Sequence, residues 1–151
     1  MGKQMDQERL HAWIDAFLSA HNVLALATGS GDRLRCTPLE YTWHDDALWI
    51  LSEGGRKFSA LRENRQVAAT VFETHTSFSS LQALQMEGVA EIEDATSEDY
   101  GKEAAYRHIP ASSLRNLAEL LWLIKITPTS ISCLNTGFKA KGFSSRQTWR
   151  G

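Results

Sequence analysis

The chain has 151 residues, a length typical of one domain with a single hydrophobic core. Sixteen lysines and arginines stand against eighteen aspartates and glutamates, and the formal charge of −2 excludes the strongly basic surface of most nucleic-acid-binding proteins. The longest apolar runs, residues 23–27 and 120–124, are too short to span a bilayer. We therefore expect a single domain over residues 1–151, with neither a nucleic acid nor a membrane as partner.

The first residues lack the apolar core of a signal peptide, so we expect a cytoplasmic protein. The two cysteines, Cys36 and Cys133, are far apart and belong to no Cys-x-x-Cys pair. Their spacing gives no support to a disulfide, and we expect reduced, buried thiols.

The spacing of apolar and turn-forming residues predicts the elements in chain order. The first half is predicted to contain an amphipathic helix over 6–20, strands over 23–28 and 33–42 around a turn at 29–32, a turn at 44–46, a strand over 47–52, a helix over 56–64, a strand over 67–72 and a polar loop at 74–80. The second half is predicted to contain a long strand over 84–93, a helix over 96–108, a short helix over 112–118, strands over 121–126 and 130–134 joined by a turn at 127–129, and a tail at 135–151 without a visible period. Pro38 cannot donate to a ladder, so its strand is an edge strand or carries a bulge.

About six strands joined mostly by tight turns indicate a mainly β protein with added helices. The pattern favours an antiparallel barrel or sandwich, because the alternating strands and helices of a βαβ protein are missing.

Residues 48–62 carry the most informative local pattern, a strand followed by a Gly-Gly turn and a helix that begins with Arg56 and Lys57. Cations at a helix start oppose the helix dipole, at a cost of about 0.3–1 kcal/mol each. The free backbone N–H groups at the same helix end favour an anion. The pattern therefore predicts a phosphate-binding corner, and the alternative is a solvated Arg-Lys pair on a loop.

Several short motifs are shared with a known family. Arg35-Cys36-Thr37-Pro38, the strand at 48–52, and Arg56-Lys57 followed by Leu61, Asn64 and Val67 resemble the flavin-binding split barrels related to pyridoxamine phosphate oxidase. Gln85-Met86-Glu87-Gly88, Ala105-Tyr106-Arg107, Trp122-Leu123-Ile124-Lys125, and Gly142-Phe143 with Trp149 resemble the YhbP-like bacterial subgroup. The resemblance implies a six-stranded antiparallel split β-barrel with Greek-key topology and flanking α-helices.

The resemblance also implies a homodimer with FMN in a groove between the subunits. Arg56, Lys57 and Arg35 would then hold the FMN phosphate. The backbone of Cys36, Thr37, Pro38, Leu51 and Ser52 would face the isoalloxazine ring. Trp149 is a separate hypothesis: as an aromatic residue near the C-terminus it could reach the flavin of the partner subunit, although packing on its own subunit is the more common fate.

The chain departs from the oxidase at three points. Ile50-Leu51 stands where the oxidase presents a Tyr-Thr pair to the ring, and Ala83 stands opposite the oxidase glutamine, which Gln82 or Gln85 could replace in another register. The tail lacks the Arg/His cluster that binds the pyridoxal substrate. We therefore do not expect pyridoxamine phosphate oxidation.

Three functions stay open at this point. The first is an FMN-dependent oxidoreductase of unknown substrate, in which the flavin performs the redox step and no catalytic side chain is evident. The second is a non-catalytic binding protein for flavin, heme or another planar ligand, and the third is a dimeric barrel without cofactor. The histidines have no acidic or cysteine partners at metal-ligand spacing, so no metal site is expected. The apolar residues Trp49, Leu51 and Val71 and the strand at 84–92 motivate the dimer, because three short helices would not cover them.

Overall fold

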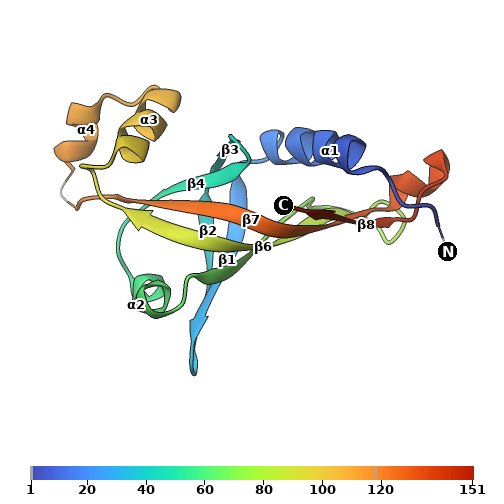
Figure 1. The fold of residues 1–151 in the computed structure, drawn as a ribbon, viewed down its shortest axis with the longest axis horizontal. Coiled ribbons are helices and arrows are strands. Elements are labelled where there is room, and N and C mark those ends of the chain that lie inside the picture. The colour runs from blue at the N-terminus through green and yellow to red at the C-terminus, as the bar shows by residue number, and fades with distance from the viewer. Residues whose placement is uncertain (1, 118) are drawn as a thin grey trace.

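One curled antiparallel sheet runs through the chain, and helices flank it (Figure 1). The structure, a computed structural model, describes residues 2–117 and 119–151. Its elements are α1 (Gln7–Ser19), β1 (Val23–Ser30), β2 (Arg33–Glu40), β3 (Thr42–His44), β4 (Ala47–Ser52), α2 (Arg56–Glu63), β5 (Gln66–Phe72), β6 (Gln82–Glu93), α3 (Glu98–Tyr106), α4 (Ala111–Arg115), β7 (Trp122–Asn135), the 3₁₀ helix η1 (Thr136–Lys141) and β8 (Arg146–Arg150).

The strands follow the order β2-β1-β5-β6-β7-β4-β3, and β8 pairs with β7 outside this path. Every pair is antiparallel. The sheet curls into a barrel that is left split between its two end strands, β2 and β3. This confirms the mainly β, antiparallel split barrel with flanking helices, but the described residues form eight strands rather than six.

Residues 122–135 form one strand, where the sequence predicted two strands separated by a turn. Pro128 lies opposite Gly88, and the register shifts at this point. Thr129 is the extra residue of this β-bulge, and the local break in the ladder accommodates the neighbouring Pro128, which has no N–H to donate. Glycine is needed opposite it, since a Cβ at residue 88 would lie 2.7 Å from the Thr127 carbonyl oxygen. The tail also forms structure that the sequence did not predict, η1 and β8.

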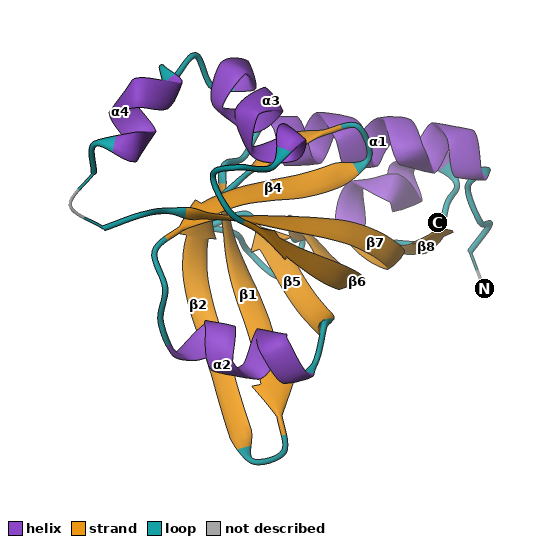
Figure 2. Cartoon of the chain, turned by 60° about the vertical axis from the view of Figure 1, so that its left-hand side comes forward, coloured by secondary structure: helices purple, strands orange, loops and turns teal. Residues whose placement is uncertain are grey.

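The main core fills the inside of the curl. Side chains that alternate along the strands, such as Leu24 and Leu26 on β1 and Leu48 and Ile50 on β4, meet the apolar face of α1 there. A second, smaller core lies on the other face of β4, beneath α3 and α4 (Figure 2). Its buried members are Ala47, Trp49, Tyr100, Ala104, Leu114 and Leu123.

A buried carboxylate anchors α3 to this part of the barrel. The Glu103 side chain is fully buried and accepts hydrogen bonds from Thr42 Oγ1 at 2.7 Å and from Arg107 Nε at 2.9 Å. Arg107 also donates to the Trp49 carbonyl at 2.9 Å and pairs with Glu40 at the end of β2. Because one guanidinium contacts both β2 and β4, α3 fixes the distance between the two sides of the split.

The amino-terminal segment is joined to the last strand, and α1 lies along β8 (Figure 1). The Met5 N–H donates to Gln147 Oε1 at 2.8 Å, and the Gln147 amide donates to the Lys3 carbonyl at 3.2 Å. These bonds explain why Gln147, a polar residue, is only 2 % exposed.

Candidate functional site

The candidate site begins where β4 runs into α2. Gly55 precedes the helix with φ 147° and ψ −175°, a backbone conformation that only glycine adopts readily. No side chain caps α2, and the first-turn N–H groups at Arg56 and Lys57 have no backbone acceptor among the described residues. The predicted helix is confirmed, and its amino-terminal end presents free donors to any anion bound there.

Three cations surround this helix end. Arg35 on β2 and Arg56 on α2 line one cavity of about 320 Å³ between the two elements, together with Asp32, Arg33, Leu34 and Ser59. Lys57 is only 8 % exposed, and its Nζ atom donates to the Glu53 carbonyl at 3.4 Å. Within the described part of the chain, the side chains of Arg35, Arg56 and Lys57 form no ion pair. The corner therefore carries positive charge that no neighbouring carboxylate neutralises by direct contact.

Lys57 shows the electrostatic consequence of this arrangement. Burial lowers the pKa of its ammonium group, the nearby Glu53 carboxylate raises it, and the Arg35 guanidinium lowers it. Arg35 is thus near enough to Lys57 for the two charges to repel each other. An anion bound between them would relieve that repulsion and satisfy the donors of α2, so the corner fits a phosphate group.

The two backbone segments expected to face a ring lie on either side of the split. By register, Arg35 and Thr37 of β2 share the face of buried Thr28 and Leu26, whereas Cys36 and Pro38 point to the outer face. Pro38 can offer only its carbonyl group to a ligand.

At the end of β4, the hydroxyl of Ser52 is turned to the Glu53 carbonyl at 2.9 Å, and Leu51 packs against the smaller core. Ser52 thus uses its hydroxyl hydrogen within the chain, and Leu51, which is partly buried, can offer a ring its backbone and apolar atoms only.

Two residues of the predicted site do not match the expectation: Trp149 in its position and Cys36 in its exposure to solvent. Trp149 is on β8, which is separated from β2 by four strands, and its ring packs at 5.7 Å from that of His11. The structure therefore does not bring Trp149 to the cation corner of its own subunit. Cys36 is exposed, which corrects the expectation of two buried thiols, whereas Cys133 is buried and its pKa is raised by burial to about 12.

The chain was compared with models of known protein families. The family model described as pyridoxamine 5'-phosphate oxidase matches residues 10–132. The chain belongs to the pyridoxamine 5'-phosphate oxidase family. Among curated proteins, no sequence matches it.

Solved structures of related folds agree with this assignment. A FAD-binding protein from Mesorhizobium loti is 21% identical, with a TM-score of 0.63 over 88% of this chain and 95% of that one. General Stress Protein 26 from Bacillus anthracis is 18% identical, with a TM-score of 0.63 over 83% and 93% of the two chains. The heme storage protein HutZ from Vibrio cholerae is 17% identical, with a TM-score of 0.60 over 82% and 91%. At these identities the likeness shows the fold alone.

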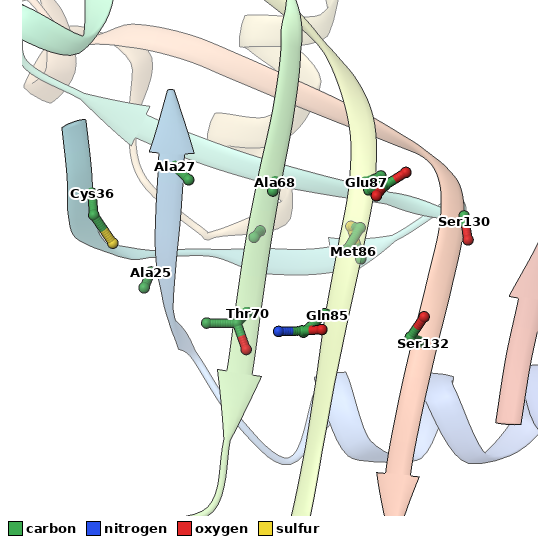
Figure 3. A pocket seen from close by; sticks show the side chains of 11 residues that line it. Ala25, Ala27, Cys36, Ala68, Thr70, Gln85, Met86, Glu87, Ser130 and Ser132 are labelled. Atoms are coloured by element: carbon green, nitrogen blue, oxygen red, sulfur yellow. The ribbon is translucent and has the colours of Figure 1, made fainter. Parts of the chain in front are cut away.

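This family member also has a shallow hollow on the outer face of the sheet that the sequence did not reveal (Figure 3). Small residues of β1 and β5, among them Ala25, Ala27 and Ala68, form its floor, and its volume is about 340 Å³. Gln85 and Thr70 lie beside this floor, so the Gln85 side chain is accessible to a ligand or partner here. Ile50, by contrast, is buried in the core. Small side chains give no hydrophobic period, so the sequence does not predict this hollow.

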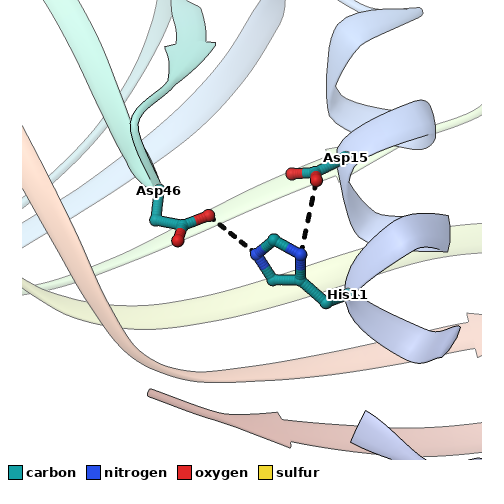
Figure 4. Close-up of side chains that lie close together, drawn as sticks. All are labelled: His11, Asp15 and Asp46. Carbon is teal, nitrogen blue, oxygen red and sulfur yellow. Dashed lines mark hydrogen bonds and ion pairs between the residues drawn. The ribbon is translucent and has the colours of Figure 1, made fainter. Parts of the chain in front are cut away.

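His11 has two acidic partners, which corrects the expectation from the sequence that the histidines have none. Its Nδ1 lies 3.3 Å from Asp15, and its Nε2 lies 2.7 Å from Asp46 in the β3–β4 turn (Figure 4). Each ring nitrogen thus faces a different carboxylate, which leaves neither free for a metal ion while these bonds are made. The cluster joins α1 to the turn.

No helix among residues 2–117 and 119–151 is long and apolar enough to cross a membrane.

Proposed function

We propose that the protein binds a flavin by its phosphate at the cation corner, with FMN as the expected form, and that it acts as an oxidoreductase of unknown substrate. The observation that supports this most directly is the convergence of Arg35, Arg56 and Lys57, without direct ion pairs, on an uncapped helix start. Family membership and the FAD-binding protein among the structural relatives support a flavin. When bound, the flavin would supply the electron-transfer chemistry, and this chain would hold the phosphate and flank the ring with backbone groups of residues 36–38, 51 and 52.

A second candidate function is binding of flavin, heme or another planar ligand without turnover. The specific observation in its favour is that Ile50 is wholly buried and Leu51 packs against the smaller core, so neither provides a polar group beside a ring. A structural relative described as a heme storage protein agrees with this alternative. A cofactor-free dimeric barrel is the third candidate.

The same proposal includes a homodimer, but the apolar residues from which the sequence predicted it are not the surface that would form it. Trp49 and Val71 are 6 % and 2 % exposed, so the subunit itself covers them. The uncovered surface is instead the outer face of the sheet.

Strand register gives this outer face two rows of mostly small side chains. One row is Cys36, Ala27, Ala68, Glu87, Ser130 and Arg150, and the next is Pro38, Ala25, Thr70, Gln85, Ser132 and Thr148. The face carries both a carboxylate and a guanidinium, so two copies packed about a two-fold axis could pair Glu87 with Arg150. We infer that this face meets a second copy of the chain.

The phosphate corner is tested by neutralising two of its cations, as Arg56→Gln with Lys57→Gln. Each charge-assisted hydrogen bond contributes about 1.5–3 kcal/mol, so we expect the dissociation constant for FMN to rise at least about a hundredfold. Riboflavin, which lacks the phosphate, should bind the parent weakly and be nearly indifferent to the change. Quenching of flavin fluorescence on titration measures both ligands.

The matched control is Lys139→Gln with Lys141→Gln, which removes the same charge from two exposed positions on η1. It should leave FMN binding unchanged. Equal binding of FMN and riboflavin by the parent, or no binding of either, would contradict the phosphate assignment. With flavin bound, reduction by a nicotinamide donor would support the oxidoreductase over the non-catalytic binding protein.

A further inference from the structure

The cluster of His11, Asp15 and Asp46 brings three metal-binding side chains within reach of one ion (Figure 4). His11 and Asp15 lie one helical turn apart on α1, and Asp46 comes from the β3–β4 turn, 35 positions after His11. One ligand atom from each side chain lies within 4.8 Å of the other two. Zinc binds ring nitrogen and carboxylate oxygen at about 2.0–2.2 Å, so small side-chain rotations are enough for all three to bind the same ion.

Asp15 is oriented for such a role by a buried neighbour. The indole Nε1 of Trp43 on β3 donates to Asp15 Oδ1 at 2.7 Å, and Trp43 is only 8 % exposed. This bond occupies one carboxylate oxygen and leaves the other, Oδ2, turned towards His11. Metal ligands in proteins are commonly held by a further hydrogen bond of this kind, which fixes their orientation. The direction of the Asp15 carboxylate is therefore set by the core and not by the ion.

The space beside the cluster is negatively charged and has room for a hydrated ion. A cavity of about 380 Å³ lies between α1 and the β3–β4 turn. Its lining residues are Asp15, Ser19, Trp43, His44, Asp45 and Asp46. Within the described part of the chain, the ion pairs of these three aspartates are with histidines and none is with a lysine or arginine. Three carboxylates around one cavity favour a bound cation.

The imidazole of His11 selects the kind of cation. Both of its ring nitrogens face carboxylates, which accept hydrogen bonds but cannot donate them, so each nitrogen needs a proton to bond to its partner. A metal ion would take the place of one of these protons, which passes to the solvent, and would bind the nitrogen and the carboxylates together. Calcium and magnesium prefer oxygen ligands, whereas zinc takes imidazole and carboxylate ligands alike.

We propose that His11, Asp15 and Asp46 form a zinc site, with water at the fourth position. The ion joins α1 to the β3–β4 turn and thereby holds the amino-terminal helix on the barrel. The inference does not depend on the proposed function, because the cation corner is built from β2 and α2 rather than from these elements.

Titration calorimetry of zinc chloride into metal-stripped protein without a histidine tag tests the site. We expect one zinc ion per chain with a micromolar dissociation constant, and a melting temperature that rises with zinc because the ion binds the folded state. His11→Gln and Asp46→Asn should each weaken zinc binding at least about tenfold. Magnesium chloride at the same concentrations should neither bind nor stabilise the protein.

The variant Asp46→Asn keeps the fold intact for this test. Asp46 has φ 53°, and asparagine adopts this left-handed conformation as readily as aspartate. The matched control is His75→Gln, which removes an imidazole from an exposed position in the β5–β6 loop and should bind zinc as the parent does. Absence of zinc binding by the parent, or equal binding by the parent and both site variants, would reduce the cluster to a hydrogen-bonded contact. Equal affinity for zinc and magnesium would show that the imidazole is not a ligand and would overturn the zinc assignment.

Discussion

Two side chains are held where their charged forms are disfavoured, and they lie at different places in the barrel. Lys57 is buried beside another cation at the proposed phosphate corner. Glu93 ends β6, and its Oε2 atom is buried without a hydrogen-bond partner. Burial raises the pKa of the Glu93 carboxyl, the neighbouring carboxyls of Asp99 and Glu91 raise it further, and Lys125 opposes them. The first residue would gain from a bound anion, whereas the charged form of the second destabilises the folded state.

The raised pKa of Glu93 predicts a pH dependence of stability. The folded state binds this proton more tightly than the unfolded state, so the stabilising contribution of Glu93 is fully present below the ordinary glutamate pKa of 4.5 and is lost as pH rises from there through the raised value. We expect Glu93→Gln to raise the melting temperature near neutral pH and to make little difference at about pH 4.

Thermal unfolding followed by circular dichroism measures this difference. The control is Glu91→Gln, which removes an exposed carboxylate from the same strand and should have a smaller effect. An equal gain from both variants at neutral pH would trace the effect to net charge and contradict the assignment to Glu93.

At the scale of elements, the turn between β4 and α2 depends on one glycine. Gly55 has φ 147°, whereas its neighbour Gly54 has no such constraint and a Cβ there would meet open space. We expect Gly55→Ala to lower the free energy of unfolding by about 1–3 kcal/mol and to weaken phosphate-dependent flavin binding, because the start of α2 must shift. Gly54→Ala should leave both nearly unchanged. Urea unfolding of the two variants checks the difference, and equal losses would show that the backbone at 55 is not strained.

The elements that could be predicted from the sequence are those with an apolar period or a recognisable turn. The α1 helix, the β3–β4 turn and the long β6 strand fall in this class, and Asp6 and Ser97 cap α1 and α3 through their side chains. Strand β8 could not be predicted, because its buried residue is Gln147, whose burial depends on bonds to residues more than 140 positions away. Pro128 concealed the continuity of β7, since a bulge and a turn have the same local signal.

The candidate site shows the same division. Arg56 and Lys57 stood out because two cations at a helix start are locally unfavourable, and Arg35 was added by the family resemblance. The cavity beyond them was not predictable, because Ser59 and Arg33 meet only when α2 packs across the β1–β2 hairpin. Local sequence thus identifies residues that violate a local rule, whereas a cavity is created by tertiary packing.

At the scale of the whole molecule, the outer face of the sheet predicts the state of association. We expect the parent to sediment as a dimer, at twice the 16.9 kDa of one chain. Ala68→Arg should dissociate it, because an arginine on a face of small side chains prevents close packing. The control Ala140→Arg, at an exposed position of η1, should remain dimeric. A parent that sediments only as a single chain at micromolar concentration would contradict this prediction.

The bonds between the amino-terminal segment and β8 have a consequence for the time course of folding. The backbone of Met5 and the amide of Gln147 are separated by 142 positions, so this contact has nearly the greatest loop length that the chain allows. A ribosome adds about 5–20 residues per second, so α1 leaves it on the order of ten seconds before its partner strand exists. During that interval the apolar face of α1, with Leu10, Ile14 and Leu18, has no barrel to cover it. The nascent chain thus exposes the apolar face of α1 for most of its synthesis.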